Sequence, residues 1–179
     1  MSSVSTKEAT ENRIPMGDPS SLRETMSRFI TGVIVLSVGG DHIHGMTANA
    51  FSSVSLDPPT VLVCVSHSAV MHKAILAERR FGVSVLGAEQ ETLARFFADK
   101  KRPLGPEQFH GLDWEPGRYT GAPLLRGALG WLECELTDVH DSGDHSIFLG
   151  NVAAAGKGSE TSGLLFFNGA FQQVGPVSK

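Results

Sequence analysis

The stretch GMTANAFSSVSLDPP, residues 45–59, lies between two strongly apolar runs of the chain and differs from both. Its side chains are short, with hydroxyl or amide groups at Thr47, Asn49, Ser53 and Ser55 and alanines between them. Small residues on a strand let a flat molecule approach the backbone, and hydroxyls and amides offer hydrogen bonds without a fixed charge. The composition suits a heteroaromatic ring with carbonyls and ring nitrogens, but it equally suits a weakly packed edge strand or a surface loop.

The segments around this stretch predict β strands. Residues 32–38 and 60–66 are near-continuous apolar runs rich in β-branched residues, which is typical of strands covered on both faces. Residues 42–56 would return as a single strand paired with the first run, and the prolines after Asp57 would end it. Further strands are expected at residues 81–87, 128–136, 145–156 and, as a hairpin turning at Asn168-Gly169, 164–174.

Three segments predict helices. Residues 20–30 carry a capping box with Ser21 as the cap, residues 68–78 begin with Ser68 as the cap, and residues 89–100 form a third. Mostly antiparallel strands with a few helices at the ends or corners indicate a mostly-β barrel or sandwich, because a doubly wound parallel sheet needs a helix after nearly every strand. The long segment 101–123 is expected to be functional or packed by its own aromatic residues.

The composition restricts the possible partners. The chain has 179 residues, 41% of them hydrophobic and 19% charged, with a net charge of −4 and a pI near 5.9. No basic field is present to attract nucleic acid or an anionic membrane, and no apolar run approaches the length of a membrane span. We expect a polar N-terminal tail at 1–18, one domain at 19–175 and a short tail at 176–179. Two cysteines in apolar runs favour a reducing cytoplasm.

The segment SHSAVMHKAI provides a candidate phosphate site. Ser66, His67 and Ser68 precede the predicted second helix, and His72 lies one turn further along it. The N-terminus of a helix presents unpaired N–H groups and a partial positive charge, both of which favour phosphate. An ordinary helix cap has the same sequence, so the segment leaves both interpretations open.

The histidines could serve as ligands or as acid–base groups. His145 follows the turn SGD at the mouth of an apolar strand, where it could donate a hydrogen bond to a ligand or titrate near neutral pH. It could also be a solvated turn residue. His42 and His44 alternate on one strand, but no cysteine pair, HExxH motif or spaced carboxylate accompanies them, so no metal site is predicted.

Taken in order, these segments resemble the flavin reductase family of small reductases that serve two-component monooxygenases. The matching pieces are RFITGVIVLSV, GMTANAFSSVSLDPPTVLVCVS, FGVSVLGAEQETLARFFA, RGALGWLECEL, GDHSIFLGNV and LLFFNGAFQQV. They follow the order of the family, and the resemblance covers about residues 22–174. The resemblance implies an antiparallel split β-barrel with flanking helices. It places Thr47, Ala48, Asn49 and Ala50 beside the isoalloxazine, Ser53 and Ser55 near the ribityl chain or phosphate, and Ser66, His67, Ser68 and His72 near the phosphate. It places Phe171 near the flavin, and Asp144 and His145 on the nicotinamide side.

The same resemblance implies an NAD(P)H-dependent flavin reductase that transfers a hydride from nicotinamide C4 to flavin N5. Reduced FMN or FAD would then pass to a partner oxygenase, and a homodimer would complete the site. Two alternatives share the fold: a flavoprotein that holds FMN tightly and acts on a small organic substrate, and a flavin-binding module without catalysis.

Overall fold

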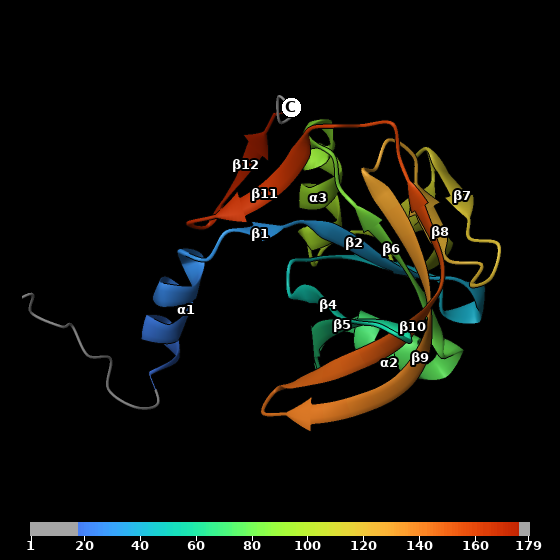
Figure 1. Cartoon of the computed structure of the whole chain (residues 1–179), viewed down its shortest axis with the longest axis horizontal. Coiled ribbons are helices and arrows are strands. Elements are labelled where there is room, and N and C mark those ends of the chain that lie inside the picture. The colour runs from blue at the N-terminus through green and yellow to red at the C-terminus, as the bar shows by residue number, and fades with distance from the viewer. Residues whose placement is uncertain (1–17, 176–179) are drawn as a thin grey trace, which may run out of the picture.

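A computed structural model describes residues 18–175 of the chain, and antiparallel β strands form most of it (Figure 1). The mostly-β class expected from the sequence is confirmed. The tails expected at the two ends lie outside the described residues, except that Asp18 caps the first helix.

The three α-helices occur near their predicted positions, at α1 (Pro19–Ser27), α2 (Val70–Glu78) and α3 (Glu91–Ala98). Two predicted caps are wrong. The side chain of Asp18 accepts the backbone N–H groups of Ser20 and Ser21, so the helix begins earlier than expected and Ser21 lies within it. A turn in which the N–H of Ala69 donates to Ser66 O delays the start of α2, so Ala69, not Ser68, is the residue before the helix. Within residues 18–175 no helix is long and apolar enough to cross a membrane.

Twelve strands of the described chain form three antiparallel sheets. The large sheet has the order β3-β2-β6-β9-β10-β5-β4, and the smaller ones have the orders β1-β11-β12 and β7-β8. The strands are β1 (Thr31–Gly32), β2 (Ile34–Val38), β3 (His44–Ala48), β4 (Phe51–Leu56), β5 (Pro59–Ser66), β6 (Arg80–Val85), β7 (Trp114–Pro116), β8 (Pro123–Leu125), β9 (Gly130–Ser142), β10 (His145–Lys157), β11 (Gly163–Phe167) and β12 (Ala170–Val174).

The two edges of the large sheet follow one another in the chain. β3 ends at Ala48 and β4 begins at Phe51, so only Asn49 and Ala50 connect them. Such a connection spans about 11 Å at most, so the sheet curls until its edges meet there. The expectation of one continuous strand over 42–56 is therefore wrong: β3 pairs with β2, whereas β4 pairs with β5. The small residues between them allow the chain to leave one edge and enter the other.

The strand β2 is buried along its whole length because it separates two hydrophobic cores. Ile34, Leu36 and Val38 point into the core enclosed by the curled sheet, as their shared cluster indicates. Val35 packs on the opposite face with Phe97 of α3, in the second core. The apolar run of β2 is thus explained by burial on both faces, as the sequence predicted.

The long segment between α3 and β8 is packed by its own side chains. Phe109 is buried, and its ring lies between those of Phe97 and Trp114, with centroids 5.5 and 5.7 Å away. The carboxylate of Glu133, from β9, accepts hydrogen bonds from the end of this segment at residues 118–120. Packing by its own aromatic residues, one of the two roles expected for the segment, is therefore confirmed.

Candidate functional site

An open cavity of about 560 Å³ lies where the two edges of the curled sheet meet. Its walls come from β3, the 49–50 connection, the last residues of β5 and the start of α2. The end of α3 with the chain that follows it, residues 97–104, and His145 complete the lining. Ligand cavities of small-molecule proteins have about this size. A second hollow of about 150 Å³ adjoins it and shares residues 47–49 and Ala98 with it.

The strand side of the cavity is small and uncharged. Ala48 and Ala50 present little more than backbone, and Cys64 stands beside them. The hydroxyl of Thr47 donates to Ala94 O at 2.7 Å, and the amide of Asn49 donates to the hydroxyl of Thr31 at 3.1 Å. These bonds hold the two polar side chains against α3 and β1, which leaves the main chain at 47–50 accessible to a flat group.

Another part of the lining is cationic, and the sequence interpretation did not identify it. Lys100 and Arg102 line the cavity, and among residues 18–175 no Asp or Glu does. The guanidinium of Arg102 donates to Asp99 O at 2.7 Å and to Gly45 O at 2.6 Å, while its buried Nε has no partner within residues 18–175. The charged run DKKR at 99–102 was the available signal, but a charge run at the end of a helix usually faces solvent.

His44 lies next to Arg102 inside this wall. Its Nε2 is 3.1 Å from Arg102 Nη2, and its Nδ1 is 2.8 Å from the amide nitrogen of Gln108. Burial, with a further contribution from the Arg102 charge, lowers the pKa of His44 to about 4. Burial also lowers the pKa of Arg102. His44 is therefore neutral near pH 7, and Arg102 is the charged group of this pair.

His145 enters the cavity from the tip of the β9–β10 hairpin. Ser142 pairs with His145 across a turn formed by Gly143 and Asp144, as the sequence predicted. The Nδ1–H of His145 donates to the carboxylate of Asp144 at 2.7 Å, and this bond keeps the pKa of Asp144 below its ordinary value. Because Nδ1 is engaged, Nε2 is the ring atom left for a ligand.

The structure brings some of the candidate residues together and separates others. Those that line the main cavity are Thr47, Ala48, Asn49, Ala50, Ser66, Ser68 and His145. Phe171 lines the adjoining hollow. Ser53 and Ser55 lie further along β4, and Asp144 lies behind His145. His67 and His72 point away from the cavity toward Ser146, so a role in phosphate binding would require another arrangement of their side chains.

Comparison with known proteins gives a consistent result over most of the chain. The family described as "Flavin reductase like domain" matches residues 26–175. An NADH-dependent FAD reductase of Streptomyces globisporus is 48% identical over 159 residues, which is 89% of this chain and 87% of that protein. The NADH-dependent flavin reductase StyB of Pseudomonas fluorescens is 36% identical over 154 residues, which is 84% of this chain and 86% of that protein.

Solved structures agree with the sequence matches. BorF, the flavin reductase component of a bacterial two-component tryptophan halogenase, superposes with a TM-score of 0.86 at 48% identity, over 89% of this chain and all of that one. The NADH:FAD oxidoreductase SgcE6 of Streptomyces globisporus, in complex with NAD and FAD fragments, gives a TM-score of 0.85 at 44% identity, over 93% and 99% of the two chains.

Proposed function

Because the chain belongs to the flavin reductase family, we propose that it oxidises NADH and reduces a free flavin, which then serves a partner oxygenase. The cavity carries this proposal, because its lining combines the small uncharged residues at 47–50 with Lys100, Arg102 and His145. A flavin nucleotide matches these two kinds of lining, because its ring is flat and uncharged while its phosphates are anionic. When both nucleotides are bound, the nicotinamide C4 supplies the hydride that flavin N5 accepts.

The residues of the cavity suit the binding and orientation of these two groups. The main chain at 47–50 offers hydrogen bonds to the edge of the ring, and Ala48 lets the ring approach. Arg102 and Lys100 line the cavity and supply the positive charge that attracts the phosphates. Asp144 orients His145, whose Nε2 positions the nicotinamide. No general base is needed, since the protein has only to align donor and acceptor.

FAD is the flavin and NADH the donor that we assign. Two relatives that are 48% and 45% identical to this chain are named NADH-dependent FAD reductase and NADH:FAD oxidoreductase. BorF serves a halogenase, and HsaB of Mycobacterium tuberculosis, 32% identical over 162 residues, is the reductase subunit of a flavin-dependent monooxygenase. We infer a separate oxygenase partner for this chain too. Neutral hydrogen bonds of about 1 kcal/mol each hold the ring loosely enough for reduced flavin to leave.

The curled sheet, whose two edge strands β3 and β4 are joined through residues 49–50 but do not pair with each other, supports the split barrel that the resemblance implied. We also propose that the protein is a homodimer. Leu22 and Met26 of α1, and Phe29 just after it, are apolar side chains with exposed fractions of 62%, 53% and 65%. Figure 1 shows that α1 stands away from the large sheet. A second copy would cover this apolar face. Analytical ultracentrifugation tests the proposed homodimer.

We also infer a cytoplasmic location, because the two cysteines are free and not joined in a disulfide.

Steady-state oxidation of NADH with increasing FAD or FMN tests the proposed function. A reductase turns over many equivalents of added flavin, with FAD preferred over FMN and NADH over NADPH. Anaerobic spectra must show the flavin band bleaching after NADH is added. A flavin that stays bound and is reduced only once would instead assign the chain to the flavoproteins that hold FMN, and a bound flavin that NADH does not bleach would leave a binding module without catalysis.

A further inference from the structure

A second group of polar side chains lies outside the cavity, around the hydroxyl of Ser146. The Nε2 atoms of His67 and His72 lie 3.0 and 2.8 Å from Ser146 Oγ. This hydroxyl donates to the carboxylate of Asp141 at 2.6 Å, and Asp141 Oδ1 is also 3.5 Å from His67 Nε2. One point in space is therefore surrounded by two imidazole nitrogens and a carboxylate oxygen.

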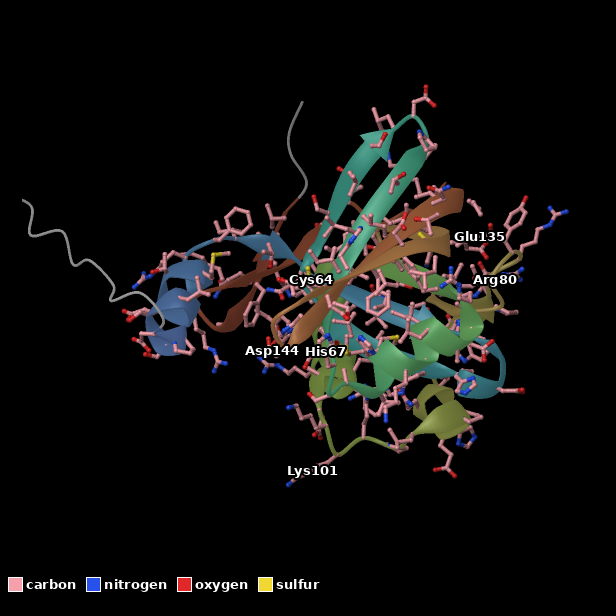
Figure 2. All side chains as sticks on the ribbon, turned by 90° about the horizontal axis from the view of Figure 1, so that it is seen from below. Cys64, His67, Arg80, Lys101, Glu135 and Asp144 are labelled. Carbon is pink, nitrogen blue, oxygen red and sulfur yellow. The ribbon has the colours of Figure 1, made fainter. Side chains whose placement is uncertain are left out.

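Four different elements bring these residues together. His67 follows β5, His72 is in the first turn of α2, Asp141 is near the end of β9 and Ser146 is near the start of β10. The ring of His72 packs edge-on against Phe148, with a centroid distance of 5.1 Å, which fixes its direction. The N–H of His67 donates to Asp144 O at 3.0 Å, and Figure 2 shows the two residues next to each other.

The spacing of the side-chain atoms matches that of a metal site. The ligand atoms of His67, His72 and Asp141 all lie within 4.8 Å of one another. A tetrahedral zinc site with bonds of about 2.0–2.1 Å has ligand atoms about 3.3 Å apart, close to the separation between His67 and Asp141. The Nε2 lone pairs become available when each neutral ring moves its proton to Nδ1. The fourth position is then open to the Ser146 hydroxyl or to water.

Solvent access to the cluster and its local charge also favour the binding of a metal ion. Ser146 is completely buried, but the side chains of His67 and Asp141 are 41% and 78% exposed, so an ion can reach the site from solvent. Within residues 18–175 no lysine or arginine forms an ion pair with Asp141. A cation would therefore meet a carboxylate without a competing positive charge.

We propose that His67, His72 and Asp141 bind one divalent transition-metal ion, with zinc as the ion best suited to two imidazoles and a carboxylate. The bound ion joins the β9–β10 hairpin to the turn between β5 and α2. That hairpin carries His145, and that turn contributes Ser66 and Ser68 to the cavity. Metal binding thus stabilises the native arrangement of this end of the sheet, since the unfolded chain has no such site.

Isothermal titration of the tag-free chain with ZnCl₂, without flavin or NADH, tests the proposal independently of any catalytic function. We expect one Zn²⁺ per chain with micromolar affinity, and a higher unfolding temperature in the presence of the ion. His67→Gln and Asp141→Asn each remove one ligand from an exposed position and are expected to weaken binding at least tenfold.

His140→Gln is the matched control, because His140 is exposed on the same hairpin and lies outside the cluster. It must bind Zn²⁺ as the parent chain does. The proposal is overturned if the parent chain binds no Zn²⁺, or if His67→Gln and Asp141→Asn bind it as tightly as the control. Circular dichroism of each variant confirms that a loss of binding is not a loss of fold.

Discussion

Two regions of the molecule concentrate polar groups away from solvent, and they differ in how those groups are satisfied. In the segment before β8, the carboxylate of Glu133 accepts three backbone N–H groups, from Arg118, Tyr119 and Thr120, and the hydroxyl of Thr120. In the cavity wall, Arg102 uses its Nη atoms for two carbonyls, and its buried Nε has no partner in the part of the chain described.

The difference separates a structural group from a binding group. Glu133 is buried, and the chain itself provides donors to both of its oxygens, so its contribution belongs to folding. A buried donor without an acceptor costs free energy in the folded protein, unless a ligand supplies the acceptor. Arg102 is a charged residue that lines the cavity, so part of its contribution is expected to appear on ligand binding.

The largest effect is expected for Glu133→Gln. The amide nitrogen of the new side chain would face backbone N–H donors, and the charge-assisted hydrogen bonds would be lost. We expect the free energy of unfolding to fall by about 3 kcal/mol. Urea unfolding followed by circular dichroism measures this change.

Glu135→Gln is the control for that experiment, because Glu135 lies two residues along the same strand with its side chain exposed (Figure 2). Its replacement is expected to change stability by less than about 0.5 kcal/mol. Equal stability of the two variants would contradict the structural role assigned to Glu133.

Arg102→Gln tests whether Arg102 is the binding group in the comparison with Glu133. Loss of a charge-assisted hydrogen bond to phosphate is expected to cost about 2 kcal/mol of binding, which raises the dissociation constant for FAD about thirtyfold. Fluorescence quenching of added FAD measures it. The neighbouring Lys101→Gln is the control, since Lys101 is exposed and does not line the cavity. A variant that unfolds more easily but binds FAD normally would show that Arg102 acts only on the fold.

The sequence predicted the strands and helices well where burial alone determines them. β2 alternates between two cores and β9 buries Cys134 and Leu136 on one face, so their apolar patterns were direct signals. The hairpin at Asn168-Gly169 was equally clear, because both residues adopt positive φ. These features depend on the periodicity and turn chemistry of a few neighbouring residues.

Features that depend on contacts distant in sequence could not be predicted in this way. The break at Asn49 exists because β4 pairs with β5 instead of β2, and no local pattern marks that choice. Arg102 reaches the cavity because α3 packs against β3. This packing places Arg102 beside Gly45, which lies 57 residues earlier in the sequence. The cluster of His67, His72 and Asp141 likewise required the pairing of β10 with both β5 and β9.

His145→Ala separates orientation of the nicotinamide from binding of the flavin. With Arg102 and the 47–50 strand intact, the affinity for FAD is expected to stay nearly unchanged. Anaerobic reduction by NADH is expected to slow about tenfold, which corresponds to about 1.4 kcal/mol of lost stabilisation. Stopped-flow absorbance measures the rate, and His140→Ala on the same hairpin serves as the control. An unchanged rate would exclude His145 from the reaction.

The smallest effect concerns pH and the neutral partner of Arg102. The pKa of His44 is about 4 in the folded protein, against 6.5 ordinarily, so the unfolded chain takes up a proton in this interval that the folded chain refuses. Stability therefore falls as the pH drops through this range, by about 1 kcal/mol from His44 alone between about pH 7 and about pH 5.5.

Burial also lowers the pKa of His72, which changes stability in the same direction, so the parent chain must be compared with His44→Gln. The variant is expected to lose less stability over this interval, by the contribution of His44. Urea unfolding at both pH values measures the difference. Identical pH dependence would mean that His44 takes up its proton as readily in the folded wall as in the unfolded chain, and Arg102 would then not be the only charge of the pair.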